Sequence, residues 1–204
     1  MPFQIRDVRE HELELVLAIN NSAGPSILPM DAEKVRFFWE NADYFRVLEQ
    51  DDAVTGFLVG FSDRAPHDSP NFRWFRERHS NFLYIDRIVI AAPRRGGGRG
   101  RAFYADAMSF AEPRWAHLCC EVFLGVGYDP ALLFHGAFGF REVGQQTMEG
   151  TGLRACMLMK DLGSHAWIAQ TYGDALPDEP WLAPRQGPAP ARKPRSSTST
   201  SACA

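Results

Sequence analysis

The sequence predicts a mixed α/β fold in which a mostly antiparallel sheet is flanked by helices. Three observations support this prediction. The chain has 204 residues, 45% of them hydrophobic, which is enough to bury one sizeable core. Runs rich in β-branched and aromatic residues alternate with segments of helical periodicity. Two pairs of strand-like runs are joined by short turns, and strands joined in this way are antiparallel.

The first part of the chain is predicted to form a strand, two helices and a hairpin. The first helix places Leu13, Val16 and Leu17 on one face, and Asp31 is suited to cap the start of the second. Asp51 and Asp52 form the hairpin turn. The predicted elements are a strand at 3–6, helices at 7–20 and 31–41, and strands at 44–50 and 53–61.

A long polar stretch, residues 62–81, separates this hairpin from the second part of the chain. There a strand precedes a glycine-rich turn and a helix that Pro113 ends. The predicted elements are a strand at 82–90, a helix at 102–112, a strand at 117–126, a helix at 130–138 and a hairpin of strands at 140–148 and 153–160.

The C-terminal residues differ from the rest in composition. Residues 163–185 contain Trp167 and Trp181 but no sustained periodicity, and we interpret them as an extension of a domain formed by residues 1–162. Residues 186–204 consist largely of Pro, Ala, Ser, Thr and basic residues, which cannot bury a core. We expect this tail to be disordered, although it could also bind a partner.

Charge and hydropathy limit the possible partners and location. A net charge of −3 argues against nucleic acid as a partner, and no apolar run approaches the roughly 18 residues that a membrane span needs. The first twenty residues carry too many charges for a signal peptide. We therefore expect a soluble, cytoplasmic protein. The four cysteines, Cys119, Cys120, Cys156 and Cys203, form no C-x-x-C pair and no disulfide-dense pattern. We therefore interpret them as structural thiols in a reducing compartment.

The glycine-rich turn, residues 95–101 with the sequence RGGGRGR, is suited to bind phosphate. A strand that runs into such a turn and then into a helix gathers unpaired backbone N–H groups, and the helix dipole adds positive charge. Arg95, Arg99 and Arg101 add full charges. The glycine spacing of a dinucleotide-binding turn is not met, and no Gly-Lys-Ser/Thr is present for a mononucleotide P-loop. A flexible turn with solvated arginines is the alternative.

At these residues the chain resembles the GNAT superfamily of N-acetyltransferases. Residues 95–100 match its R-x-x-G-x-G/A turn, which binds the pyrophosphate of acetyl-CoA. Residues 128–140, YDPALLFHGAFGF, resemble its second motif, N-x-x-A-x-x-F-Y-x-x-x-G-F. Element order and length also fit, so the resemblance covers roughly residues 2–162. Two positions depart from the family pattern: Tyr128 replaces the asparagine, and His135 replaces the tyrosine.

The resemblance implies a GNAT fold and acetyl-CoA as a co-substrate, without a metal. It assigns backbone N–H groups of the motif strand to the carbonyl and the pantetheine arm. The residues expected to bind acetyl-CoA are Ile88, Val89, Ile90, Arg95, Gly96, Gly97, Gly98, Arg99, Gly100, Arg101, Tyr128 and Phe134.

Acetyl transfer needs a base for the amine and an acid for the CoA thiolate. Asp86 is the candidate base, because strand alternation places it on one face with Tyr84, Ile88 and Ile90. A structural salt bridge is the alternative. His135 is the candidate acid, since an imidazole with a pKa of about 6.5 could protonate a thiolate. A packed structural histidine is the alternative.

The acceptor is expected to meet the aromatic part of residues 62–81, because connections this long tend to be functional. Phe72, Trp74 and Phe75 could form a lid over the acceptor, with Tyr84 beside them. A contact within a homodimer is an equal alternative.

The sequence therefore predicts an acetyl-CoA-dependent N-acetyltransferase that transfers an acetyl group directly to an amine of a small molecule or a protein. The competing hypothesis is a non-catalytic acyl-CoA-binding or sensor module of the same fold. The sequence does not distinguish an acetyl donor from a longer acyl donor.

Overall fold

The computed structural model describes residues 3–24, 27–125, 130–149 and 152–172. The predicted disordered tail, residues 186–204, lies outside these ranges, and only the first part of the predicted C-terminal extension is described. No helix in the described part of the chain is long and apolar enough to cross a membrane.

The strands form one mixed sheet of seven strands in the order β1-β2-β3-β4-β5-β7-β6. Every neighbouring pair is antiparallel except β4 and β5, which are parallel. The predicted mixed, mostly antiparallel sheet is thus confirmed. The strands are β1 (Gln4–Asp7), β2 (Tyr44–Gln50), β3 (Ala53–Ser62), β4 (Phe82–Ile90), β5 (His117–Phe123), β6 (Arg141–Thr147) and β7 (Arg154–Asp161).

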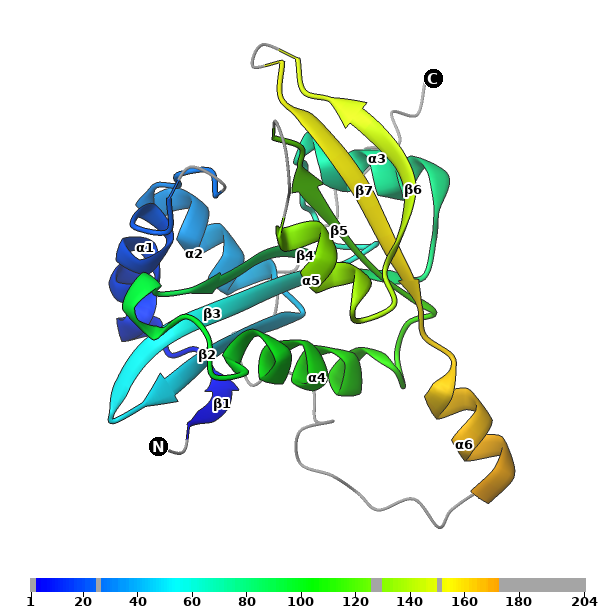
Figure 1. The fold of residues 1–204 in the computed structure, drawn as a ribbon, viewed down its shortest axis with the longest axis horizontal. Helices are drawn as coiled ribbons and strands as arrows, with labels where there is room; N and C mark the ends of the chain where they lie inside the picture. Colours follow the sequence, from blue (N-terminus) through cyan, green and yellow to red (C-terminus); the bar gives the residue numbers. More distant parts are fainter. Residues whose placement is uncertain (1–2, 25–26, 126–129, 150–151, 173–204) are drawn as a thin grey trace, which may run out of the picture.

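Helices cover both faces of this sheet (Figure 1). One core cluster joins α1, α2 and α3 to the sheet, with Val16, Phe38 and Phe75 among its buried residues. A second cluster on the other face contains Phe103 and Phe110 of α4, with α5 packed against it. The helices are α1 (Leu13–Asn21), α2 (Ala32–Asn41), α3 (Pro70–Arg78), α4 (Arg99–Ala111), α5 (Pro130–Gly136) and α6 (Ser164–Tyr172), with short 3-10 helices at Glu10–Glu12 and Ala92–Arg94.

Helix α3 was not predicted, because it lies within the polar stretch 62–81. Its start has clear local causes: the Ser69 side chain accepts a hydrogen bond from the backbone N–H of Phe72, and Pro70 occupies the first turn. Its apolar side chains then point into the core. The long connection is therefore an ordered helix that closes one side of the sheet.

The sheet divides between β4 and β5. These strands pair over only three residues, Phe82–Tyr84 with His117–Cys119, and they diverge after Tyr84. Strand β5 continues along β7 instead, so that β5, β7 and β6 form a wing that turns away from β1–β4 (Figure 1). Within the described residues, the divergence leaves one edge of β4, from Ile85 to Ile90, without a strand beside it.

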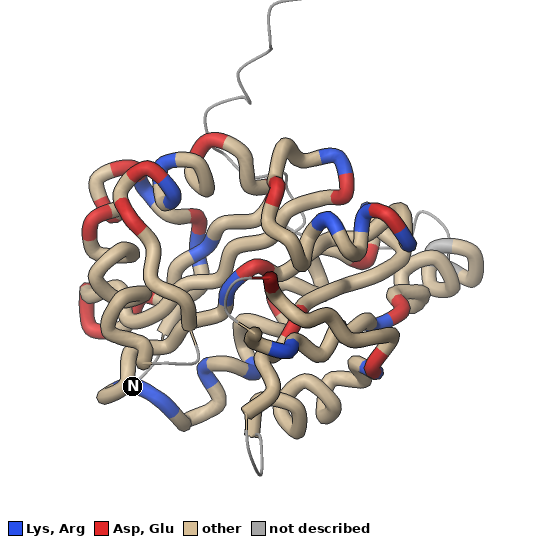
Figure 2. The backbone as a smooth tube through the Cα atoms, turned by 90° about the horizontal axis from the view of Figure 1, so that it is seen from above, with Lys and Arg blue, Asp and Glu red and all other residues tan. Residues whose placement is uncertain are grey.

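A buried ion-pair network fixes α4 to the sheet. The Arg46 guanidinium on β2 contacts the Asp106 carboxylate on α4 at 2.7 Å and Asp7 on β1 at 3.1 Å. Tyr44 donates a second hydrogen bond to Asp106 at 2.5 Å. Elsewhere too, acidic and basic residues are interspersed along the chain (Figure 2). The network matters for the site, because α4 carries the glycine-rich turn at its start.

Gly56 on β3 lets β4 approach closely because it has no side chain, and we expect Gly56→Ala to destabilise the protein. An added Cβ would lie 2.6 Å from the backbone oxygen of Val89, so the two strands would have to separate. Overpacking of this kind costs about 1–3 kcal/mol in the free energy of unfolding. Urea denaturation measures the loss. Gly163→Ala is the control, because nothing lies within 4 Å of the Cβ position there. Equal stability of the two variants would contradict the prediction.

Candidate functional site

A pocket of about 880 Å³ occupies the space between β4 and β5. Its floor is the free edge of β4 together with the last residues of β5. Gly100 and Arg95 of the glycine-rich turn line it, and so do residues 27–31 of the connection between α1 and α2. A single cavity therefore reaches both the predicted phosphate-binding turn and this connection.

The glycine-rich turn has a backbone that favours glycine. Gly96, Gly97 and Gly98 all have positive φ angles, of 86°, 59° and 78°, and Gly98 precedes the first residue of α4. The N–H groups of the first turn of α4 have no partners within the helix. The turn therefore presents backbone donors at the positive end of a helix dipole, as the sequence predicts.

Two of the arginines in the turn contact the protein itself. The Arg99 guanidinium donates to the Gln50 side chain at 2.6 Å and to the Gly96 carbonyl at 3.1 Å. Arg95 donates to the carbonyls of Ile90 and Ala23, at 3.2 and 2.7 Å. Both side chains thus shape the turn. Arg101 is exposed.

Gly100 and Phe134 come from the two predicted CoA-binding motifs, residues 95–100 and 128–140, and they lie against each other. A Cβ on Gly100 would lie 3.3 Å from the Phe134 ring of α5, so only glycine allows this close approach without displacement. Both residues line the pocket, as do Ile88, Val89 and Ile90. The close approach of Gly100 to Phe134 and the N-terminus of α4 fit the pyrophosphate and the extended pantetheine arm of CoA. Tyr128 lies outside the described residues.

A β-bulge at Asp86 changes which way the side chains of β4 point. Val59 of β3 is opposite Arg87 and Gly60 is opposite Ile85, so Asp86 has no partner on β3. Val89 consequently packs in the same cluster as Tyr84, whereas Ile88 and Ile90 pack on the opposite face. The expected common face of Asp86, Ile88 and Ile90 is therefore wrong, because simple alternation does not allow for a bulge.

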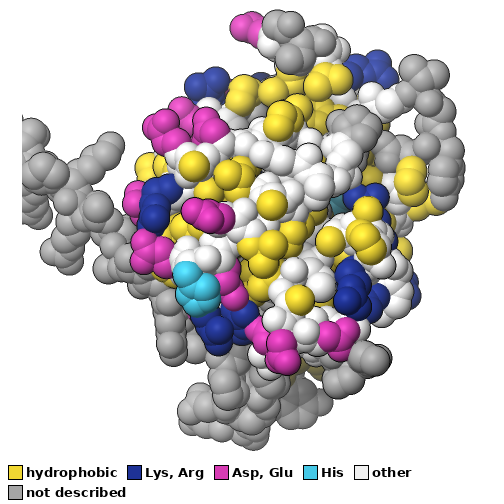
Figure 3. Space-filling view, turned by 90° about the vertical axis from the view of Figure 1, so that its left-hand side faces the viewer, with side chains coloured by type: hydrophobic (Ala, Val, Ile, Leu, Met, Phe, Trp, Pro, Cys, Tyr) yellow, Lys and Arg dark blue, Asp and Glu magenta, His cyan; other side chains and the backbone are white. Residues whose placement is uncertain are grey.

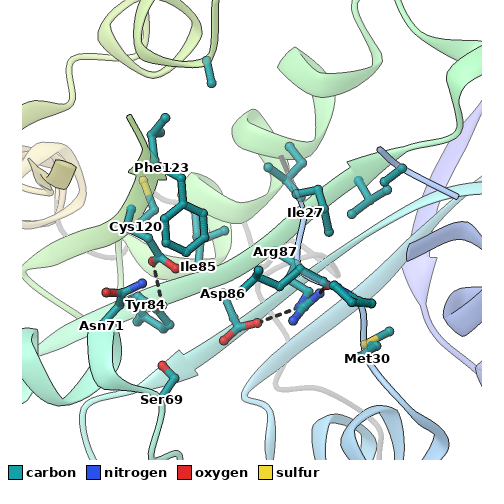
Figure 4. Close-up of a pocket in the computed structure, with 18 of the residues that line it drawn as sticks. Ile27, Met30, Ser69, Asn71, Tyr84, Ile85, Asp86, Arg87, Cys120 and Phe123 are labelled. Atoms are coloured by element: carbon teal, nitrogen blue, oxygen red, sulfur yellow. Dashed lines mark hydrogen bonds and ion pairs between the residues drawn. The ribbon is translucent and has the colours of Figure 1, made fainter. Parts of the chain in front are cut away.

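Asp86 lies in the pocket wall, where its carboxylate contacts Arg87 (Figure 4) and His67. His67 Nε2 is 2.7 Å from one oxygen, and Nε of Arg87 donates to the other at 3.1 Å. Burial raises the pKa of Asp86, but the His67 hydrogen bond and the charges of His67, Arg87 and Lys34 outweigh it. The pKa lies below the usual range, and the group is an ionised carboxylate with low proton affinity.

Glu121 on β5 is a second carboxyl in the pocket, and the sequence analysis did not identify it. The Tyr84 hydroxyl donates to its carboxylate at 2.6 Å. Burial and the nearby charge of Asp86 raise the pKa of Glu121 to about 7, against the opposing hydrogen bonds of Tyr84 and Asn71. Such a carboxyl exchanges its proton near neutral pH, as a general base requires.

A sequence signal for Glu121 did exist. It is the one charged residue in the apolar run LCCEVF, residues 118–123, and a charge in a buried strand is unusual unless it serves a purpose. Its counterpart Tyr84 was predicted to be near the acceptor, and it lines the pocket.

His135 also lines the pocket, and its ring is positioned by Tyr104 of α4. The Tyr104 hydroxyl is 2.7 Å from Nδ1 of His135. Burial and the neighbouring Cys120 raise the pKa of Tyr104 well above its usual value, so the phenol keeps its proton. The Tyr104 hydroxyl and Nδ1 therefore share a hydrogen bond that orients the ring and leaves Nε2 outside this contact.

The predicted aromatic lid is not over the pocket. Phe72 and Phe75 of α3 have exposed fractions of 0% and belong to the core. Trp74 packs against Gly144 of β6, where an added Cβ would lie 2.6 Å from its ring. The helical spacing of α3 turns these rings inward, and it is Ser69 and Asn71, at the start of the helix, that line the pocket.

A family model described as the acetyltransferase (GNAT) family matches residues 13–140. The chain belongs to the GNAT family. The predicted family and fold are thus confirmed. Members of this family use acetyl-CoA and an acceptor. No curated protein sequence matches the chain significantly.

Solved structures of GNAT proteins share this fold. The ribosomal-protein-S18-alanine N-acetyltransferase from Escherichia coli is 14% identical, with a TM-score of 0.60 over 79% of this chain and 94% of that one. Ard1 from Thermoplasma volcanium is 17% identical, with a TM-score of 0.63 over 79% and 99%. Arabidopsis thaliana Naa50, in complex with the bisubstrate analogue CoA-Ac-MVNAL, is 13% identical, with a TM-score of 0.59 over 78% and 99%.

We expect Gly100→Glu to weaken CoA binding by at least about tenfold. The new Cβ would press against the Phe134 ring at 3.3 Å, and the carboxylate adds a negative charge where a pyrophosphate would lie. Calorimetric titration with CoA measures the affinity. Gly163→Glu adds the same charge at an exposed position and serves as the control. Unchanged affinity in Gly100→Glu would remove the turn from the CoA site.

Proposed function

We propose that the protein is an acetyl-CoA-dependent N-acetyltransferase that transfers an acetyl group directly to an amine of a small molecule or a protein. The observation that carries this proposal is the position of Glu121, a partly buried carboxyl whose pKa is raised to about 7, in the pocket that also reaches the glycine-rich turn. Acetyl-CoA would supply the acetyl group as a thioester.

Glu121 is the proposed general base. An acceptor amine is mostly protonated at neutral pH and must lose a proton before it attacks a thioester. A carboxylate whose conjugate acid has a pKa of about 7 takes that proton far more readily than an ordinary glutamate does. Asp86 suits this role less well, because its pKa is lowered and both of its oxygens are already bonded.

His135 is the proposed general acid. Its Nδ1 is engaged with Tyr104, so Nε2 is the nitrogen proposed to act. As an imidazolium, His135 would give its Nε2 proton to the departing CoA thiolate and become the neutral imidazole. Tyr104 would then act on the orientation of the ring.

Direct transfer is favoured because the cysteine in the pocket is a poor nucleophile. Cys120 lines the pocket, but it has an exposed fraction of only 2%. Burial and the charge of Glu121 raise the pKa of its thiol well above the usual value. The reactive form of a cysteine is the thiolate, so an acetyl-enzyme at Cys120 is disfavoured.

Release of free CoA thiol tests the proposal. Purified protein is given acetyl-CoA with a panel of polyamines, amino acids and peptides that have a free N-terminus. We expect amine-dependent thiol release for at least one class, with mass spectrometry showing the acetylated amine. Tight CoA binding without turnover on any amine would contradict an enzyme and support the sensor hypothesis.

We expect the rate of acetyl transfer to rise with pH through about pH 7 as Glu121 loses its proton. Glu121→Gln removes the base, and turnover should fall about 10²-fold while CoA affinity holds. Turnover against pH for both proteins, with the accepted amine, measures the effect. An unchanged rate in Glu121→Gln would show that another group takes the proton.

We expect His135→Phe to lose about 10²-fold in turnover with little change in CoA affinity. The replacement is compatible with the aromatic surroundings, because the rings of Tyr104, Phe134 and Phe140 lie 5.4–5.6 Å away. Tyr104→Phe should give a smaller loss of the same kind. A purely structural histidine predicts altered thermal stability at normal turnover.

A further inference from the structure

We propose that Asp86 and Arg87 are positioning residues that hold the connection between α1 and α2 against β4, and so set the affinity for the acceptor. The proposal rests on the proposed function, and it places the acceptor amine between this connection and Glu121. Residues 27–31 of the connection line the same pocket as Asp86, Arg87 and Glu121.

Arg87 is the link between the strand and the connection. One terminal nitrogen donates to the Leu28 carbonyl and also to the Asn20 side chain of α1, at 2.7 Å in the second case. Its guanidinium also lies 5.8 Å from the centre of the Phe38 ring on α2. Figure 4 shows the side chain turning from β4 toward Ile27 and Met30. Arg87 thus joins β4, α1, α2 and the connection at one point.

Asp86 fixes the direction of the Arg87 side chain. Because of the bulge, the two neighbouring side chains lie close enough for Nε of Arg87 to donate to Asp86 at 3.1 Å. The opposite oxygen of Asp86 is held by His67, which stacks on Phe61 with ring centres 4.4 Å apart. The carboxylate is therefore immobile, and Arg87 is bonded at both ends of its guanidinium.

His67 orients its ring through the bond to Asp86. Its Nδ1 is buried and has no hydrogen-bond partner in the described part of the chain, whereas Nε2 is 2.7 Å from the Asp86 carboxylate. The charges of Arg87 and Lys34 also act on Asp86, and the charge of Asp86 acts on Glu121.

Other contacts tie the connection at its two ends, and Arg87 supports its middle. Arg95 of the glycine-rich turn donates to the Ala23 carbonyl, and Asn21 bonds both the N–H and the carbonyl of Met30, at 3.0 and 2.9 Å. The connection belongs to the α1 and α2 side of the molecule, where hydrophobic side chains gather between charged ones (Figure 3). Leu28 itself is 41% exposed. The hydrogen bond from Arg87 to the Leu28 carbonyl therefore holds this residue in place, because burial of its side chain contributes little.

Steady-state kinetics separate a positioning role from proton transfer. We expect Arg87→Met to raise the KM for the acceptor by about tenfold or more, because a charged hydrogen bond to the connection is lost. The KM for acetyl-CoA and the turnover number should change by less than about threefold. Asp86→Asn should also raise the KM for the acceptor, but by less than Arg87→Met does. The double variant should have the same KM for the acceptor as Arg87→Met, as expected when Asp86 acts through Arg87.

The pH profile gives a second readout. Removal of the Asp86 charge lowers the pKa of Glu121, so the acidic limb of the rate profile in Asp86→Asn should move to lower pH. A large fall in turnover at every pH with an unchanged acceptor KM would make Asp86 the base and overturn the proposal. Arg36→Met is the matched control, since Arg36 on α2 is exposed and pairs with Glu10; its constants should equal those of the wild type.

Hydrogen exchange tests the same proposal without an acceptor. Amides in peptides that cover residues 20–31 should exchange faster in Arg87→Met and in Asp86→Asn than in the wild type or in Arg36→Met. Calorimetry with CoA confirms that each variant is folded. Unchanged exchange in both variants would overturn the inference. Absence of wild-type turnover would count only against the proposed function, so the two failures are distinguishable.

Discussion

The short parallel pairing of β4 with β5 is the constraint on which the site depends. The two strands share three residue pairs and then separate, because β5 continues along β7 while β4 continues along β3. The separation opens a pocket in the middle of a sheet without exposing the two cores on either side. It also frees the backbone of β4 on one edge, directly beside the start of α4. The binding turn and the acid-base groups are thereby brought to one cavity.

Two carboxyls in this cavity have opposite proton affinities. Asp86 is bonded by His67 and Arg87, so its pKa lies below the usual range. Glu121 receives hydrogen bonds from the neutral groups of Tyr84 and Asn71, and burial together with the charge of Asp86 raises its pKa to about 7. Different surroundings thus give similar side chains different tasks. In the proposed mechanism, Asp86 helps to hold the connection between α1 and α2, and Glu121 moves a proton.

The fold could be predicted because its signals are local. Glycine spacing, the Asp31 cap and the hairpin turn at Asp51 and Asp52 depend on neighbouring residues, and each lies where expected. The catalytic arrangement depends on contacts between distant segments. A bulge reversed the faces of β4, a capped helix turned Phe72 and Phe75 into the core, and Glu121 gains its character only from burial beside Asp86. Sequence spacing carries little information about such contacts.

The central claim is that Glu121 is poised to accept a proton near neutral pH. Nuclear magnetic resonance of the side-chain carboxyl carbons, with Glu121→Gln used to assign the signal, measures this directly. We predict a titration midpoint of about pH 7 in the wild type. In Asp86→Asn the midpoint should be lower, because a neighbouring negative charge is gone. A wild-type midpoint near the usual value for glutamate, about 4.3, would contradict the account.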